Sequence, residues 1–142
     1  MKLYNITKNR VIVDDLKIAE SFKERTKGLL GRSEIEESEG LLIPKCNWIH
    51  MFFMKFPIGV VFLKTERSPR LRLFEAGRTD AKKNSEPEKN SKTYRVINIV
   101  DDIKPWRISP LVWKADSVLE IKSGILKEKD LVSFNDQLTC LE

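Results

Sequence analysis

An uninterrupted apolar run near the middle of the chain restricts the fold more than any other sequence feature. Residues 59–63 read Gly-Val-Val-Phe-Leu, so both faces of an extended segment would be apolar there. A strand that is apolar on both faces is typical of the centre of a sheet that is covered on either side. We therefore predict a central strand over residues 59–64.

Shorter runs of β-branched and apolar residues, separated by turn residues, predict the other strands. They cover residues 3–6, 10–13, 16–20, 40–43, 47–54, 94–100, 117–121 and 131–134. A turn at 105–108 leads into a further strand, and a charged turn at 127–130 precedes the last one. This pattern predicts an α+β fold, predominantly antiparallel β, built as a curled sheet or partial barrel.

One main helix is expected near residues 22–30. Ser21 and Glu24 have the spacing of a capping box, in which the serine accepts from the third helical amide and the glutamate reaches back. Phe22, Thr26, Leu29 and Leu30 follow at helical spacing, which predicts that they form one inner face.

The length of 142 residues fits one domain, and one segment inside it has a different composition. Residues 82–92 contain no apolar side chain, which is typical of a segment that cannot pack into a core. We predict a single domain over residues 1–142 with a flexible, protruding insertion at about residues 65–93.

The formal net charge is +5, and most of it falls in that insertion. Residues 64–92 hold nine Lys or Arg and five Asp or Glu, an excess of four positive charges. Because the acids are interspersed among the bases, we expect a solvated loop, and nucleic acid is not an expected partner. Docking of a nucleic acid or a protein through residues 64–94 stays open as an alternative.

Neither a secretory signal nor a membrane span is expected from the sequence. The N-terminal residues lack an apolar segment, and the most apolar stretch, residues 48–63, is interrupted by His50, Lys55 and Pro57. We expect a soluble, cytoplasmic protein that does not contact membranes. Its abundance of Lys and Glu is a composition typical of thermophilic proteins.

Several blocks along the chain resemble the domain-of-unknown-function 192 family, whose activity is not settled. The blocks are residues 24–32, 39–43, 46–58, 61–63, 104–107 and 115–124. The sequence departs from the family pattern at three positions: Gly59 and Lys129 replace an aspartate and a glycine, and Met51 replaces a threonine. The change at Gly59 removes the carboxylate nearest to His50 and so weakens a catalytic interpretation.

The enzymatic alternative is a hydrolase or a transferase that uses His50, either alone or as the base for a Cys46 nucleophile. In an extended strand, residues four apart lie ~13 Å from each other, so a hydrogen bond between these two needs a bulge or turn.

One histidine and two distant cysteines, Cys46 and Cys140, leave too few ligands for a closed zinc site. We expect no metal and no cofactor, and whether the cysteines pair stays open. Glu120 and Asp130, considered as paired carboxylates, carry no flanking signature.

The stretch from Cys46 to Leu63 holds the only histidine and a dense aromatic cluster. Core packing explains most of this cluster, with Trp48, His50 and Lys55 as the residues to test for exposure. Two cations of the helix region, Arg25 and Arg32, have a competing interpretation: they form surface ion pairs with Glu24, Glu36 or Glu39.

Our first hypothesis is a non-enzymatic binding or accessory domain for a small anionic or sugar-like ligand. The hypothesis combines aromatic side chains, an imidazole and cations, which together can orient such a ligand. The candidate ligand-binding residues are Arg25, Arg32, Trp48, His50, Lys55, Trp106 and Arg107.

Overall fold

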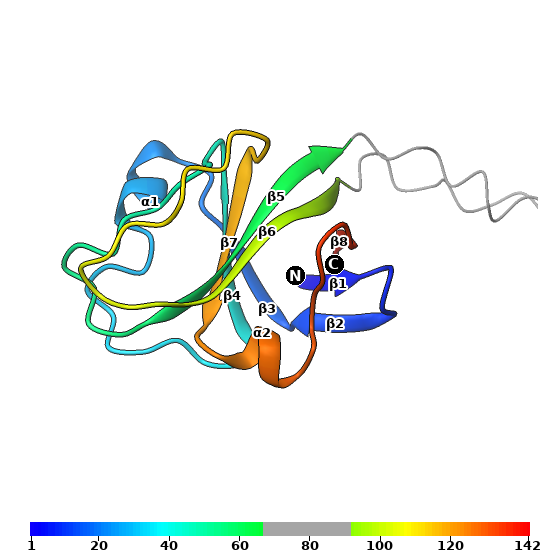
Figure 1. Ribbon diagram of the computed structural model, residues 1–142, viewed down its shortest axis with the longest axis horizontal. Helices are drawn as coiled ribbons and strands as arrows, with labels where there is room; N and C mark the ends of the chain where they lie inside the picture. Colours follow the sequence, from blue (N-terminus) through cyan, green and yellow to red (C-terminus); the bar gives the residue numbers. More distant parts are fainter. Residues whose placement is uncertain (67–91) are drawn as a thin grey trace, which may run out of the picture.

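A computed structural model of the protein describes residues 1–66 and 92–142, so nearly all of the predicted insertion lies outside the described residues (Figure 1). The eight strands form one sheet in the order β2-β1-β8-β6-β5-β7-β4-β3. All neighbouring pairs are antiparallel except β3 and β4. The strands are β1 (Lys2–Asn5), β2 (Arg10–Val13), β3 (Asp15–Ile18), β4 (Glu39–Pro44), β5 (Ile58–Glu66), β6 (Thr93–Ile103), β7 (Ser117–Lys122) and β8 (Gln137–Leu141).

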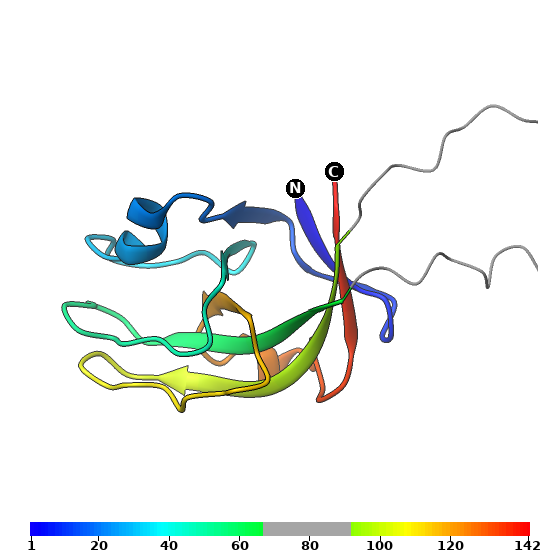
Figure 2. The same cartoon turned by 90° about the horizontal axis from the view of Figure 1, so that it is seen from above.

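The predicted fold class is confirmed: the sheet is strongly curled and mostly antiparallel (Figure 2). The sheet curls far enough for its edge strand β3 to reach the chain just before β1, where the Leu16 amide donates to the Met1 carbonyl at 2.8 Å. The sheet nevertheless does not close into a barrel, because β2 and β3 are its two edges and do not pair.

Strand β5 lies at the centre of the sheet, as the apolar run predicts. It pairs with β6 on one side and β7 on the other, and residues 58–63 are all buried. Alternate side chains enter two separate cores. Val61 and Leu63 pack in the first core, which lies against β1 and β2, whereas Val60 and Phe62 pack in the second core, on the opposite face.

Helix α1 (Phe22–Lys27) begins with the predicted capping box. The Ser21 Oγ accepts from the Glu24 amide at 3.1 Å, and the Glu24 carboxylate accepts from the Ser21 amide at 2.9 Å. The predicted inner face is wrong, because no residue of the helix is buried and Phe22 is 78% exposed. The chain leaves the helix at Gly28, where φ is +47°, so Leu29 reaches the second core from the following turn and not from the helix.

Three other local predictions are wrong. Residues 47–54 form loop structure, with a single isolated bridge between His50 and Ile108, instead of a strand. The expected charged turn at 127–130 is half helical, because a second short helix, α2 (Ile125–Glu128), extends over its first two residues and only residues 129–130 form a turn. Residues 131–134 are also not a strand, and the last strand is β8.

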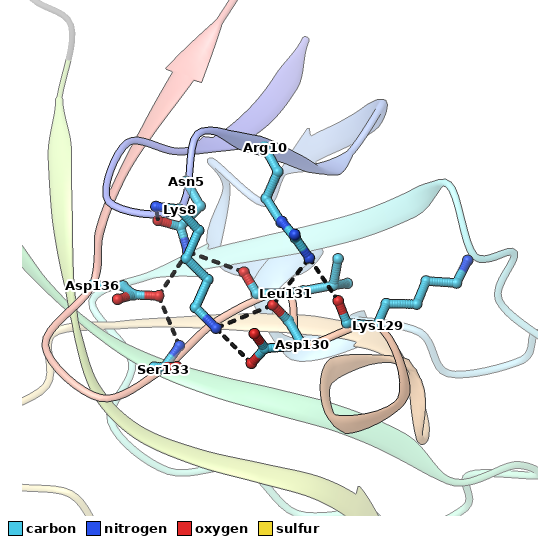
Figure 3. A network of polar contacts seen from close by, with 8 residues as sticks. All are labelled: Asn5, Lys8, Arg10, Lys129, Asp130, Leu131, Ser133 and Asp136. Atoms are coloured by element: carbon cyan, nitrogen blue, oxygen red, sulfur yellow. Dashed lines mark hydrogen bonds and ion pairs between the residues drawn. The ribbon is translucent and has the colours of Figure 1, made fainter.

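A buried polar network explains why residues 131–136 leave the strand conformation (Figure 3). Asn5 is fully buried, and its Nδ2 donates to the Leu131 carbonyl at 3.0 Å and to the Asp136 carboxylate at 2.7 Å. The Asn5 Oδ1 accepts from the Lys8 amide at 3.0 Å, and Asp136 also accepts from the Ser133 amide at 2.8 Å. The Leu131 carbonyl and the Ser133 amide are therefore bonded to side chains and not to a neighbouring strand, whereas Asn135 and Asp136 bond to Val96 of β6 through their backbones.

We predict that Asn5→Ala lowers the free energy of unfolding by about 2–3 kcal/mol, because it removes one of the two donors to the buried Asp136 carboxylate and leaves the Leu131 carbonyl without its side-chain donor. Urea unfolding would measure this. The matched control is Asn98→Ala, at an exposed asparagine whose side chain accepts from the adjacent Ile99 amide. Equal, small effects of the two substitutions would contradict a stabilising function of the network.

Candidate functional site

Two loops at one end of the sheet lie side by side and carry most of the exposed aromatic residues (Figure 2). The first aromatic loop (residues 45–57) joins β4 to β5, and the second aromatic loop (residues 104–114) joins β6 towards β7. Backbone amides of Val112, Ser109 and Met51 donate to the carbonyls of Asn47, Ile49 and Arg107 at 3.0, 2.9 and 2.7 Å. The loops therefore run antiparallel and hold each other in register.

Side chains of the first aromatic loop alternate between the protein interior and its surface. Ile49 and Met51 are buried in the second core. Trp48, His50 and Phe52 point the other way, and the two hydrophobic rings among them are 47% and 37% exposed. The predicted alternation of an extended segment thus exists, although the segment pairs with a loop and not with a strand.

The exposed rings form a continuous row, which we call the aromatic strip: Trp48, His50, Phe52, Trp106 and Phe53. The centroid of the His50 ring lies 6.1 Å from that of Trp48 and 5.0 Å from that of Phe52, on which it stacks. Trp106 lies 6.1 Å from Phe52 and meets Phe53 edge to face at 4.9 Å. Such contacts fix the rings relative to one another while leaving their outer sides in solvent.

Two rings of the strip sit on unusual backbone. Phe53 and Trp106 have φ values of 64° and 65°, in the left-handed region that glycine or asparagine normally occupies. Both are also strongly exposed, at 72% and 60%. A bulky residue in this conformation costs stability, and such residues are concentrated at functional sites.

The structure brings together only part of the predicted site. Trp48, His50 and Trp106 share the aromatic strip, and Lys55 and Arg107 are exposed in the same two loops. The prediction that residues 46–63 are mostly core is correct for the inward side chains and wrong for Phe52 and Phe53, which are exposed. The residues singled out for a test of exposure, Trp48, His50 and Lys55, are all exposed.

Arg25 and Arg32 belong to the helix region and are bonded to residues outside the aromatic strip. Arg25 donates to the Glu20 carbonyl at 3.3 Å, and Arg32 pairs with Glu39 at 2.7 Å. The ion pair between Arg32 and Glu39 is the one expected under the competing interpretation of the cations in this region.

The enzymatic alternative gains no support from the position of the cysteine. The Cys46 thiol donates to the Trp48 carbonyl at 3.0 Å, and within the described residues no hydrogen bond joins it to His50. Burial raises the pKa of the thiol, which disfavours the reactive thiolate. Both Cys46 and Cys140 are free thiols.

Glu120 is a chemically unusual residue that the sequence interpretation undervalued. It lies on β7 and is 7% exposed, on the sheet face that carries the second core. Burial raises its pKa from the ordinary value of 4.5 to about 7. The signal was present as one acid between Leu119 and Ile121 in a strand that is otherwise apolar on both faces. Its supposed partner, Asp130, instead pairs with Lys8 on the surface.

Comparisons with known proteins agree with the resemblance seen in the sequence. The sequence model of the domain-of-unknown-function 192 family, described as an uncharacterized ACR, matches residues 4–68. The predicted resemblance to this family is confirmed over these residues, which make up slightly less than half of the chain. A search of curated proteins gave no match.

Two solved structures share the fold of this protein. One is a protein of unknown function from Novosphingobium aromaticivorans, with a TM-score of 0.65, 19% identity, and coverage of 96% of this chain and 81% of that one. The other is described as a putative transcription regulator from Sinorhizobium meliloti, with a TM-score of 0.62, 17% identity, and coverage of 96% and 88%. At these identities the similarity shows the fold and nothing further.

The described parts of the chain contain neither a cluster of metal ligands nor a helix that could span a membrane. No group of three or more His, Cys, Asp or Glu residues is placed to hold a metal ion there. No helix in those parts is long and apolar enough to cross a membrane.

We predict that Glu120 makes stability fall as the pH rises from about 4.5 to 7. In this window the unfolded carboxyl ionises while the folded one keeps its proton, so the folded state loses about 3 kcal/mol relative to the unfolded state. Urea unfolding of the wild type and Glu120→Gln at pH 4 and pH 8 would measure this, since the variant lacks the titrating group. An unchanged difference in stability between the two proteins across this range would contradict the raised pKa.

Proposed function

We propose that the protein is a non-enzymatic binding domain that holds a small anionic, sugar-like ligand on the aromatic strip. The single observation that carries this proposal is the row of four consecutive ring contacts, 4.9–6.1 Å apart, along an exposed edge of the fold. Exposed apolar surface of this kind usually marks an interaction site.

The rings suit a ligand with a flat, partly apolar face. Trp48 and Trp106 expose about half of their surface while their inner sides are held by neighbouring rings. Large, rigid aromatic side chains provide contact area at a low entropy cost because they are already fixed before binding. The CH groups of a sugar ring can pack on such a surface with the sugar hydroxyls left in water.

The charge of the two aromatic loops favours an anionic ligand. Together the loops contain five basic residues and no acidic one, in a chain that has 21 acids. The basic residues are Lys45, Lys55, Lys104, Arg107 and Lys114. Within the described residues, Lys55 and Arg107 take part in no ion pair. They can therefore pair with a carboxylate or sulfate on the ligand without breaking an existing contact.

Single-stranded nucleic acid is a second candidate, and the same loops favour it. Proteins that bind single strands combine a basic surface with aromatic rings on which bases stack. The sequence placed the basic excess in residues 64–92 and gave nucleic acid little weight, whereas the two loops concentrate basic and aromatic residues without any acid. An oligonucleotide belongs in any binding test of this surface.

We predict that oligogalacturonate, an acidic sugar chain, binds the wild type and that Trp48→Ala or Trp106→Ala weakens this binding about tenfold or more. Isothermal titration calorimetry would measure the affinities, with a neutral sugar chain and oligo(dT) titrated in parallel. Tighter binding of oligo(dT) than of the acidic sugar would replace the first candidate with the second.

Trp113→Ala is the matched control. Trp113 belongs to the second aromatic loop and is 82% exposed, but it makes no ring contact with the strip among the described residues. Its removal should change the affinity less than about twofold. If all three tryptophan variants lose the same affinity, or if no anionic chain binds, the strip is not the binding surface.

A further inference from the structure

A cavity separate from the aromatic strip lies between α1, the turn that follows it, and strands β3 and β4. Its volume is about 420 Å³, which is in the range of small-molecule sites. The lining is mainly apolar, with Ile18, Leu30 and Leu41 among its walls. Lys17, Lys27 and Arg32 contribute basic side chains, and Glu24 an acidic one.

The Glu120 carboxyl lies behind this cavity. Gly28 lines the cavity, and a Cβ atom at this glycine would lie 3.8 Å from the Glu120 Oε2. Leu41, another lining residue, is the direct antiparallel partner of Glu120 in the sheet, so both side chains project from the same face. The glycine therefore leaves an approach from the cavity to the carboxyl that a larger residue would narrow.

The carboxyl has no compensating group within the described part of the protein. Burial alone accounts for its raised pKa, with no hydrogen bond or nearby cation contributing. Arg25 makes no ion pair with it and instead donates to the Glu20 carbonyl. No described side-chain oxygen is sealed from solvent without a partner, so the Glu120 oxygens border an accessible space. A buried carboxylate without a partner is costly, and a cationic group reaching it would offset that cost.

The outer part of the cavity has the opposite charge. Lys17 and Arg32 share Glu39, at 3.7 and 2.7 Å, whereas Lys27 forms no ion pair among the described residues. The cavity therefore combines an acid behind Gly28 in its wall, apolar lining residues and a cation, Lys27, that is in no ion pair among the described residues. This distribution matches a ligand with an ammonium group, a carboxylate and an apolar side chain.

We propose that this cavity binds a small amino acid with an apolar side chain, whose ammonium group pairs with Glu120 and whose carboxylate faces Lys27. The site is independent of the aromatic strip, so loss of sugar binding at the strip leaves it unaffected. Because the ammonium group takes the place of the carboxyl proton, binding near neutral pH releases protons to the buffer.

The test uses the full chain with two probes that differ only in the ammonium group, L-leucine and 4-methylpentanoate. Calorimetry or NMR titration should show saturable leucine binding and affinity for 4-methylpentanoate lower by about tenfold or more. Glu120→Gln should weaken leucine binding by about tenfold or more, because the neutral amide cannot pair with the ammonium group.

Lys27→Ala provides a second variant on the exposed surface, where folding is not at risk. It should weaken leucine binding several-fold, while Lys23→Ala, on the same helix but outside the cavity lining, should leave it unchanged. The proposal is overturned if leucine does not bind, or if both probes bind the wild type equally. It is also overturned if Lys27→Ala and Lys23→Ala behave alike while the folded Glu120→Gln variant binds as the wild type does.

Discussion

The pairing of β5 with β7 at the centre of the sheet is the constraint on which the rest of the structure depends. Residues 58–63 of β5 and 117–121 of β7 are all buried, so the sheet needs cover on both faces. Strands β1, β2 and β8 curl round to enclose the first core. Among the described residues, neither helix contributes a side chain to the second core: no residue of α1 is buried, and the buried residues of α2 belong to the first core. Loops must provide its cover.

This need for cover explains where the aromatic strip lies in the fold. The two aromatic loops place Ile49, Met51 and Met54 on the second core, and the alternation of an extended chain then turns the intervening rings outwards. Phe53 and Trp106 occupy left-handed turn positions in these loops although glycine would be less strained there. Covering the core needs only the inward residues, so packing leaves the exposed rings unexplained, and the proposed ligand binding would account for them.

Local patterns predicted the parts of the fold that local chemistry decides. The two-sided apolar run gave the central strand, and the Ser21–Glu24 spacing gave the helix start. The patterns failed where distant residues compete: Asn5 draws residues 131–136 out of a strand, and pairing with the second aromatic loop keeps residues 47–54 from joining the sheet. At the site, residue type identified Trp48, His50 and Trp106. The partners of Arg25 and Arg32 within the helix region depend on tertiary packing and carry no local signal. The burial of Glu120 did carry one, an acid between two apolar residues of a predicted strand.

The indole N–H signals of the three tryptophans offer the most direct measurement of whether the aromatic strip is a binding surface. In a proton–nitrogen NMR titration of the intact protein with oligogalacturonate, the signals of Trp48 and Trp106 should shift together and saturate at one ligand concentration. The signal of Trp113, which lies outside the strip, should move little. A titration in which Trp113 alone shifts, or in which none of the three responds, would contradict the proposed surface.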